Sequence, residues 1–236
     1  GVLLHARAAN ARVLALVRLS ADQLPAADVE RLLIDSSVLV RWWARRRWAE
    51  QGHDARAACR RMIAEVTSPS IQARAYIGLA EAGESIDREE LLGLVDSDEP
   101  ALKKVGLKLI ADRVRPEDKQ LLLGLVADDH SRVARLASEA LAANLGIWAL
   151  EDVQPLKQSG DPIMRRRAWW LHRSRGGWDA VIADLEAVHD PDGSIVKLGR
   201  SPRPPMYFAP SVEQQSQVQV LLVDAPLSRE VKLNIA

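Results

Sequence analysis

The sequence has little cysteine and few phenylalanines or tyrosines, and each shortage excludes a class of structure. Its one cysteine, Cys59, cannot form a disulfide within the chain, which is typical of a reducing compartment such as the cytoplasm. Aromatic residues make up 4% of the chain and apolar residues 47%, so leucine, valine and alanine must fill the interior. This composition favours helices over a β-sandwich, which needs more β-branched and aromatic residues.

Long apolar runs and an excess of one charge are also missing. The longest apolar runs are short, such as residues 121–127, so no membrane span is expected. The 32 basic and 32 acidic residues cancel, so the molecule as a whole is not steered toward nucleic acid or a membrane surface.

What the sequence does contain is a repeat of 31 residues. Three columns spaced by 31 keep their character: one is apolar, one is alanine or glycine, and one is large and mostly apolar. They read Val40, Ile71, Leu102, Val133, Met164 and Ile195; Ala44, Ala75, Gly106, Ala137, Ala168 and Gly199; and Trp48, Leu79, Ile110, Leu141 and His172. Separate small and large columns indicate stacked copies of one structural unit.

Each copy is predicted to contain two helices. The second helix follows a polar turn such as "TSPS" at 67–70 or "DDHS" at 128–131, and Asp, Ser and Pro are typical of helix starts. Its apolar residues follow the helical period, and the alanine or glycine in its middle allows a neighbouring helix to approach closely. One helix pair cannot bury both of its faces. The pattern therefore predicts an all-α fold, a right-handed α-solenoid of stacked antiparallel helix pairs.

The repeat divides the chain into three predicted segments. Residues 1–35 contain helices that begin the solenoid, residues 36–199 contain the tandem repeats, and residues 200–236 contain a proline-rich loop and a C-terminal segment. The prolines between 200 and 210 predict the loop. Residues 218–236 fit either a degenerate further helix pair or a two-stranded hairpin, and Asp224 with Pro226 favours helices.

Three strings resemble a known family. "DSSVLVRWWARRRW", "DDHSRVARLASEAL" and "SGDPIMRRRAWWLH", which begin at residues 35, 128 and 159, resemble the D-x-x-P-x-V-R-x-x-A-x-x-A-L pattern of short HEAT-like repeats. The resemblance covers roughly residues 36–199 and departs at the basic column, which reads Arg41, Gln72, Lys103, Ala134, Arg165 and Val196. It implies an α-solenoid whose second helices line a concave surface, and it implies a general binding scaffold rather than one defined activity.

The outward positions of the predicted second helices are mostly basic and include tryptophans. The candidate binding residues are Arg41, Trp42, Arg45, Arg46, Lys103, Lys104, Lys108, Arg135, Arg165, Arg166, Trp169 and Trp170. Arginine next to aromatic rings suits carboxylates, phosphates and stacked bases. We therefore predict a non-enzymatic scaffold that binds an acidic partner, with a protein or peptide favoured over nucleic acid. The competing interpretation is a solvated face without a ligand.

Two residues in the apolar columns break the pattern. Arg47 stands where other copies have Gly78, Leu109, Ala140 and Leu171, and we predict that it pairs with Glu50 or Glu81. His172 is predicted to be a core histidine rather than a ligand.

Motifs for catalysis are scarce. The five histidines stand alone, Cys59 has no neighbouring metal ligand, and phosphate-binding and G-x-S-x-G motifs are missing, so neither a metal nor a cofactor is expected. "PIMRRRAWWLHR" at 162–173 resembles the basic helix of HEAT-like alkylpurine DNA glycosylases, which also need a carboxylate in the groove. Glu139 is the one acid among the outward positions. A DNA-binding repeat protein, including such a glycosylase, is the alternative function.

Overall fold

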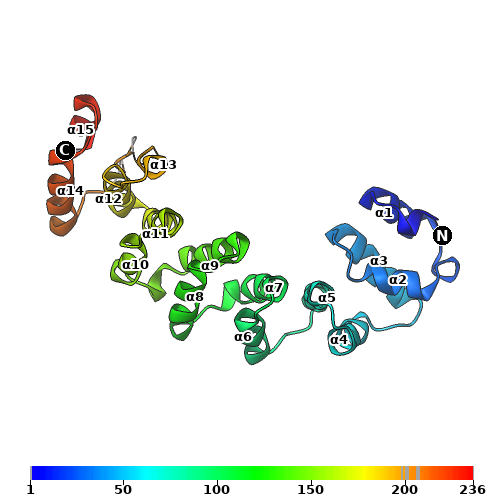
Figure 1. Cartoon of the computed structure of the whole chain (residues 1–236). Helices are drawn as coiled ribbons and strands as arrows, with labels where there is room; N and C mark the ends of the chain where they lie inside the picture. Colours follow the sequence, from blue (N-terminus) through cyan, green and yellow to red (C-terminus); the bar gives the residue numbers. More distant parts are fainter. Residues whose placement is uncertain (1, 198, 200–201, 206–207, 236) are drawn as a thin grey trace. The chain divides into compact units, whose positions relative to one another are not determined.

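The computed structural model describes residues 2–197, 199, 202–205 and 208–235, and this part of the chain is helical (Figure 1). Helices account for 73% of the structure, and the described residues contain no strand, which confirms the all-α prediction. The chain forms two compact units, Gly1–Asp112 and Arg113–Ala236, which are described separately. The boundary between them lies inside the predicted repeat segment 36–199.

Helices that follow each other along the chain pack as pairs. Unit 1 contains α1 (Ala9–Arg18), α2 (Ala26–Leu32), α3 (Val38–Glu50), α4 (Ala55–Glu65), α5 (Pro69–Glu81), α6 (Arg88–Asp96) and α7 (Pro100–Ile110). Unit 2 contains α8 (Lys119–Val126), α9 (Ser131–Ala143), α10 (Leu150–Lys157), α11 (Pro162–Ser174), α12 (Gly177–Ala187), α13 (Gly193–Val196), α14 (Val212–Asp224) and α15 (Arg229–Ile235). The pairs are α2–α3, α4–α5 and α6–α7 in unit 1, and α8–α9 and α10–α11 in unit 2.

The 31-residue period sets where every second helix begins. The helices α3, α5, α7, α9, α11 and α13 begin at residues 38, 69, 100, 131, 162 and 193. The turn before five of them contains a side-chain oxygen that accepts a hydrogen bond of 2.7–3.1 Å from the backbone N–H two residues later; these residues are Asp35, Ser97, Asp128, Ser159 and Asp190. Such turns compete with helix and so fix the point at which the chain enters it.

The small-residue column marks the closest approach between the two helices of a pair. Ala44, Ala75, Ala137 and Ala168 are fully buried. A Cβ atom on Gly106 of α7 would lie 2.8 Å from Val95 Cγ2 and 2.9 Å from Leu94 Cβ, both in α6. A Cβ atom on Gly199 would clash with the carbonyl oxygen of Asp184 in α12. At these two places glycine is required because no space exists for a side chain.

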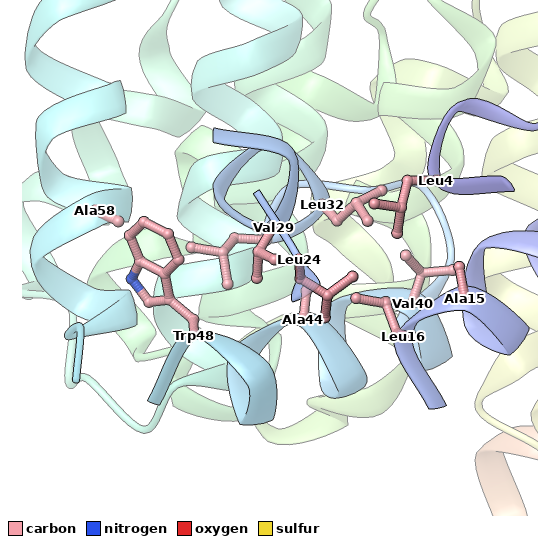
Figure 2. Packing of buried hydrophobic residues seen from close by; sticks show 11 residues of the cluster. Leu4, Ala15, Leu16, Leu24, Val29, Leu32, Val40, Ala44, Trp48 and Ala58 are labelled. Carbon is pink, nitrogen blue, oxygen red and sulfur yellow. The ribbon is translucent and has the colours of Figure 1, made fainter. Parts of the chain in front are cut away.

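Large apolar side chains beside the small column fill the cores. In unit 1, Trp48, Val40 and Ala44 of α3 pack against Leu16 of α1 and Val29 of α2, as Figure 2 shows. A second cluster joins α4 to α7 around Cys59, Leu79, Leu91 and Val105. In unit 2, α12, α14 and α15 share a cluster that contains Val181, Ile182, Leu185, Val218 and Ile235.

The C-terminal segment is helical, which resolves the alternative between a helix pair and a hairpin. The helices α14 and α15 complete the apolar cluster on α12. Residues 202–205 and 208–210 of the proline-rich loop form no regular element, and the remainder of 200–210 lies outside the described residues. Trp178 Nε1 of α12 donates a hydrogen bond of 2.6 Å to the carbonyl oxygen of Phe208. In the described part of the chain, no helix is long and apolar enough to cross a membrane.

Gly106→Ala is expected to lower the free energy of unfolding by about 1–3 kcal/mol, because the added methyl group forces α6 and α7 apart. Gly93→Ala in α6 is the matched control. A Cβ atom there would meet nothing within 4 Å, so alanine should raise the free energy of unfolding by about 0.5–1 kcal/mol through its helix propensity. Urea denaturation followed by circular dichroism measures both. A Gly106→Ala protein as stable as the wild type would contradict the close approach.

Candidate binding surface

Arg41 is not part of an open surface. It lies in α3 with 5% of its area exposed, and its Nε donates a 2.9 Å hydrogen bond to Glu81 Oε2 at the end of α5. Its Nη2 also contacts Glu81, and its Nη1 donates to the carbonyl oxygen of Asp35 at 2.6 Å. Arg45 Nη1 binds the same Glu81 carboxylate at 2.6 Å. The one carboxylate therefore binds two of the candidate arginines.

Arg165 in α11 is held in the same way. Its Nε and Nη2 donate to Asp190 at 2.9 and 3.1 Å, and its Nη1 donates to the carbonyl oxygen of Ser159 at 2.9 Å. Ser159 precedes Arg165 by six residues, just as Asp35 precedes Arg41. Each arginine therefore closes the turn before its own helix and binds a carboxylate further along the chain. We call this arrangement the arginine clamp.

Arg12 forms a third arginine clamp, which the 31-residue pattern does not predict. Arg12 of α1 donates to the carbonyl oxygen of Ala6, again six residues earlier, at 2.7 Å, and its Nη2 donates to Asp35 Oδ1 at 2.8 Å. Arg12 precedes Arg41 by 29 residues, so a strict period of 31 misses it. A search that tolerates a shift of two residues would have found it.

The Glu81 carboxylate stays ionised at neutral pH. Burial raises its pKa, but the hydrogen bonds from Arg41 and Arg45 outweigh burial, so the pKa lies below the ordinary glutamate value. The hydrogen bond with Asp190 similarly raises the pKa of Arg165. The clamps are therefore closed ion pairs whose arginines are occupied within the protein.

Trp42 and Arg46 are the exposed candidates on α3. Trp42 is 47% exposed, and its ring meets Trp43 edge to face with the ring centroids 4.9 Å apart. The Arg46 guanidinium lies 5.4 Å from the centroid of the Trp43 ring, and its Nε is 3.2 Å from Glu50 Oε1.

Arg47 is anchored inside unit 1, as predicted. Its Nη1 lies 2.5 Å from Glu50 Oε2, and its Nε donates to the carbonyl oxygen of Leu16 at 2.6 Å. The charge in the apolar column is thus satisfied by a carboxylate and by the end of α1.

The three candidate lysines lie on α7 in unit 1. Lys103 and Lys104 are partly buried, whereas Lys108 is exposed. In the part of the chain that the structure describes, Lys104 and Lys108 form no ion pair. The three lysines line neither the cavity between α9 and α11 nor the cavity beside Trp169.

Three candidates meet in unit 2, in a cavity of about 350 Å³ between α9 and α11. Its walls are formed by Ser131, Arg135 and Ser138 of α9 and by Ile163, Arg166, Arg167 and Trp170 of α11. We call it the α9–α11 pocket. The sequence predicts Arg135, Arg166 and Trp170 as binding residues but not Arg167, whose column contains Trp43 in the first copy and lies beside the apolar face.

The α9–α11 pocket keeps positive charge. Arg135 binds Glu139 at 2.7 Å, but Arg166 donates to Ser194 Oγ at 2.5 Å and Arg167 donates to the carbonyl oxygen of Val126 at 2.6 Å. Among the described residues, no carboxylate forms a direct ion pair with Arg166 or Arg167. Asp192 lies near Arg166, since its pKa is lowered by hydrogen bonds with Ser194 and also by the charge of Arg166. Ile163 and Trp170 add exposed apolar area, and Trp170 is 41% exposed. The pocket can therefore receive an acidic group beside an apolar one.

Trp169 lies elsewhere, in a separate cavity of about 310 Å³ in unit 2. Lys157, Arg165, Glu186 and Asp190 also line this cavity. The Trp169 ring is covered by Arg173, whose guanidinium carbon is 5.7 Å from the ring centroid, and its Nε1 is buried without a hydrogen-bond partner. The structure therefore does not bring Trp169 and Trp170 to one surface, although they are neighbours in the sequence.

His172 is a core histidine, as expected, but only one of its ring nitrogens is satisfied, since its Nε2 is buried without a hydrogen-bond partner among the described residues. Its Nδ1 lies 3.0 Å from Glu186 Oε2, which also binds Lys157 Nζ at 2.6 Å. Burial raises the pKa of Glu186, but the hydrogen bonds from His172 and Lys157 outweigh it and leave the pKa below its ordinary value.

Comparisons with known proteins do not identify the chain. No model of a protein family matches it, and a search of curated proteins finds no significant match. Within the described residues, no three side chains of histidine, cysteine, aspartate or glutamate are grouped so that they could hold a metal ion. The interpretation of function therefore depends on the repeat pattern and on the geometry above.

Glu81→Gln is expected to destabilise unit 1 by about 2 kcal/mol at neutral pH, because it leaves Arg41 buried without its carboxylate. Hydrogen exchange of the amides in α3 and α5 should accelerate roughly thirtyfold. Because the folded-state pKa of Glu81 is lowered, its contribution is complete above the ordinary value of 4.5 and is lost as the pH falls through the folded-state pKa. The difference between the variant and the wild type should therefore shrink in acid.

Glu50→Gln is the matched control, since this exposed glutamate also binds two arginines, Arg46 and Arg47. Exposed pairs of this kind contribute little, so exchange in α3 and α5 should stay near the wild-type rate. Equal effects of the two variants at neutral pH would refute the buried clamp.

Proposed function

We propose that this protein is a non-enzymatic, HEAT-like binding scaffold and that its α9–α11 pocket binds an acidic segment of a partner protein. One observation carries the proposal: the pocket combines two arginines that form no direct ion pair with a carboxylate in the described residues with the exposed side chains of Ile163 and Trp170.

The chemistry of the pocket fits one acidic and one apolar side chain. Guanidinium groups bind carboxylates through two parallel hydrogen bonds, and the exposed tryptophan supplies apolar area at little loss of side-chain entropy. Tryptophan and arginine are also the residues that most often dominate protein interfaces. A cavity of about 350 Å³ accommodates a few side chains of an extended segment rather than a folded domain.

Duplex DNA is less well supported as the ligand. Three arginines of the predicted basic row are already bound within the chain, since Arg41 and Arg45 share Glu81 and Arg165 binds Asp190. A DNA glycosylase would need Glu139 as the carboxylate in its groove, but Arg135 binds this glutamate at 2.7 Å. Few positive charges are thus left to contact phosphates in series.

Trp170→Ala and Arg166→Ala are each expected to weaken, by at least about tenfold, the binding to the pocket of a short, fluorescein-labelled peptide of glutamates around a central leucine. Fluorescence anisotropy at low salt measures this loss, which corresponds to about 1.4 kcal/mol of binding free energy. Arg115→Ala, which removes an exposed arginine of unit 2 outside the pocket, should bind like the wild type.

A parallel titration with duplex DNA distinguishes the alternative. Binding of DNA with a steep dependence on salt, together with no binding of the peptide at ~50 mM salt, would overturn the proposal in favour of a nucleic-acid protein. A Trp170→Ala protein that binds as many peptides per chain as the wild type, with the same affinity, would show that the pocket is not the site.

A further inference from the structure

The pocket face of α11 recurs on α3. Leu39, Trp42 and Arg46 stand four periods of 31 residues before Ile163, Arg166 and Trp170. Because α3 and α11 begin at equivalent positions, residues 38 and 162, each pair of equivalent residues occupies the same place along its helix. The first position of the three is aliphatic in both helices. The second is tryptophan in α3 and arginine in α11, and the third is arginine in α3 and tryptophan in α11.

All three residues on α3 are exposed, as their counterparts on α11 are. The tryptophan is also held in place, since Trp43 supports it edge to face and Arg46 lies over that supporting ring. The neighbouring Val38 is exposed too and extends the apolar area. A surface held in this way binds without a large loss of side-chain entropy.

The charge of α3 selects the kind of partner. Its four arginines, Arg41, Arg45, Arg46 and Arg47, are paired with two carboxylates, Glu50 and Glu81. Each carboxylate is shared by two arginines, so one positive charge is left over at each, and the one at Glu50 belongs to Arg46 and Arg47 beside the exposed face. An acidic segment compensates this surplus, whereas a neutral or basic one does not.

The other long second helices do not repeat this combination. Their residues in the same three columns include no tryptophan and read Ser70, Ala73 and Ile77 in α5; Ala101, Lys104 and Lys108 in α7; and Arg132, Arg135 and Glu139 in α9.

We infer that α3 carries a second site for the same kind of acidic segment, so that one chain engages two such segments. The α3 site consists of Leu39, Trp42 and Arg46. The inference rests on the proposed function, because the chemistry of the partner is taken from the α9–α11 pocket.

Fluorine NMR of protein labelled with fluorotryptophan tests both sites at once, since the seven tryptophans give separate resonances. Trp42→Phe and Trp170→Phe identify the two signals of interest. Titration with the unlabelled glutamate–leucine peptide should shift both signals to saturation. The signal of Trp148, which is buried and bonded to the carbonyl oxygen of Leu141, should stay in place. Calorimetry should give two peptides per chain and one for either Trp42→Ala or Trp170→Ala.

The outcomes separate the two proposals. A shift of Trp170 alone, with one peptide per chain, overturns the α3 site and leaves the proposed function standing. A shift of Trp42 alone overturns the α9–α11 pocket and the equivalence of the two helices. If neither signal moves, both proposals fail. The unchanged signal of the buried Trp48 in Trp42→Ala verifies that α3 remains folded, whereas the signal of Trp43 moves because it loses the contacting Trp42 ring.

Discussion

The structure depends on the close approach of two helices at one small residue. At Gly106 there is no space for even a methyl group between α7 and α6, and the buried alanines of the other copies leave little more. This approach fixes the distance within each pair, and the polar turns fix where each second helix begins. Because both recur every 31 residues, residues one period apart occupy equivalent places along their own helices. The α3 site and the α9–α11 pocket follow from this register.

The arginine clamps add ion pairs to this packing. They determine which positive charges remain available to a partner. In the sequence, Arg41 and Arg165 look like the other arginines of the outward row. In the fold, Arg41 and Arg165 turn back to the turn before their own helix and bind carboxylates 40 and 25 residues further along. A buried ion pair adds less stability than apolar packing of the same volume, so the clamps act mainly by orienting the turns. The remaining charge is what a ligand can use.

The sequence was sufficient for the helices, the buried columns and the local pairing of Arg47 with Glu50, because these depend on periodicity and on neighbours within one or two turns. It was not sufficient for Glu81 as the partner of Arg41, nor for the separation of Trp169 from Trp170. Both features depend on which side chains meet between two different helices. Predicting such contacts requires the distance and the rotation between neighbouring copies, which the repeat pattern does not contain. The α9–α11 pocket shows the same limit, since Arg167 lies beside the apolar face on its own helix yet lines a cavity with α9.

The distribution of the unpaired charge also bears on the choice between protein and nucleic acid. DNA presents one negative charge per ~1.7 Å along its axis, so a protein that follows it needs basic residues in every copy. Here the basic row is interrupted at one copy: the three columns of the site read Ser70, Ala73 and Ile77 in α5, although α7 has Lys104 and Lys108 there and α9 has Arg132 and Arg135. An interrupted arrangement of this kind matches a partner whose acidic segments are separated by uncharged chain. Such a partner gains affinity through the effective concentration of its second segment once the first is bound.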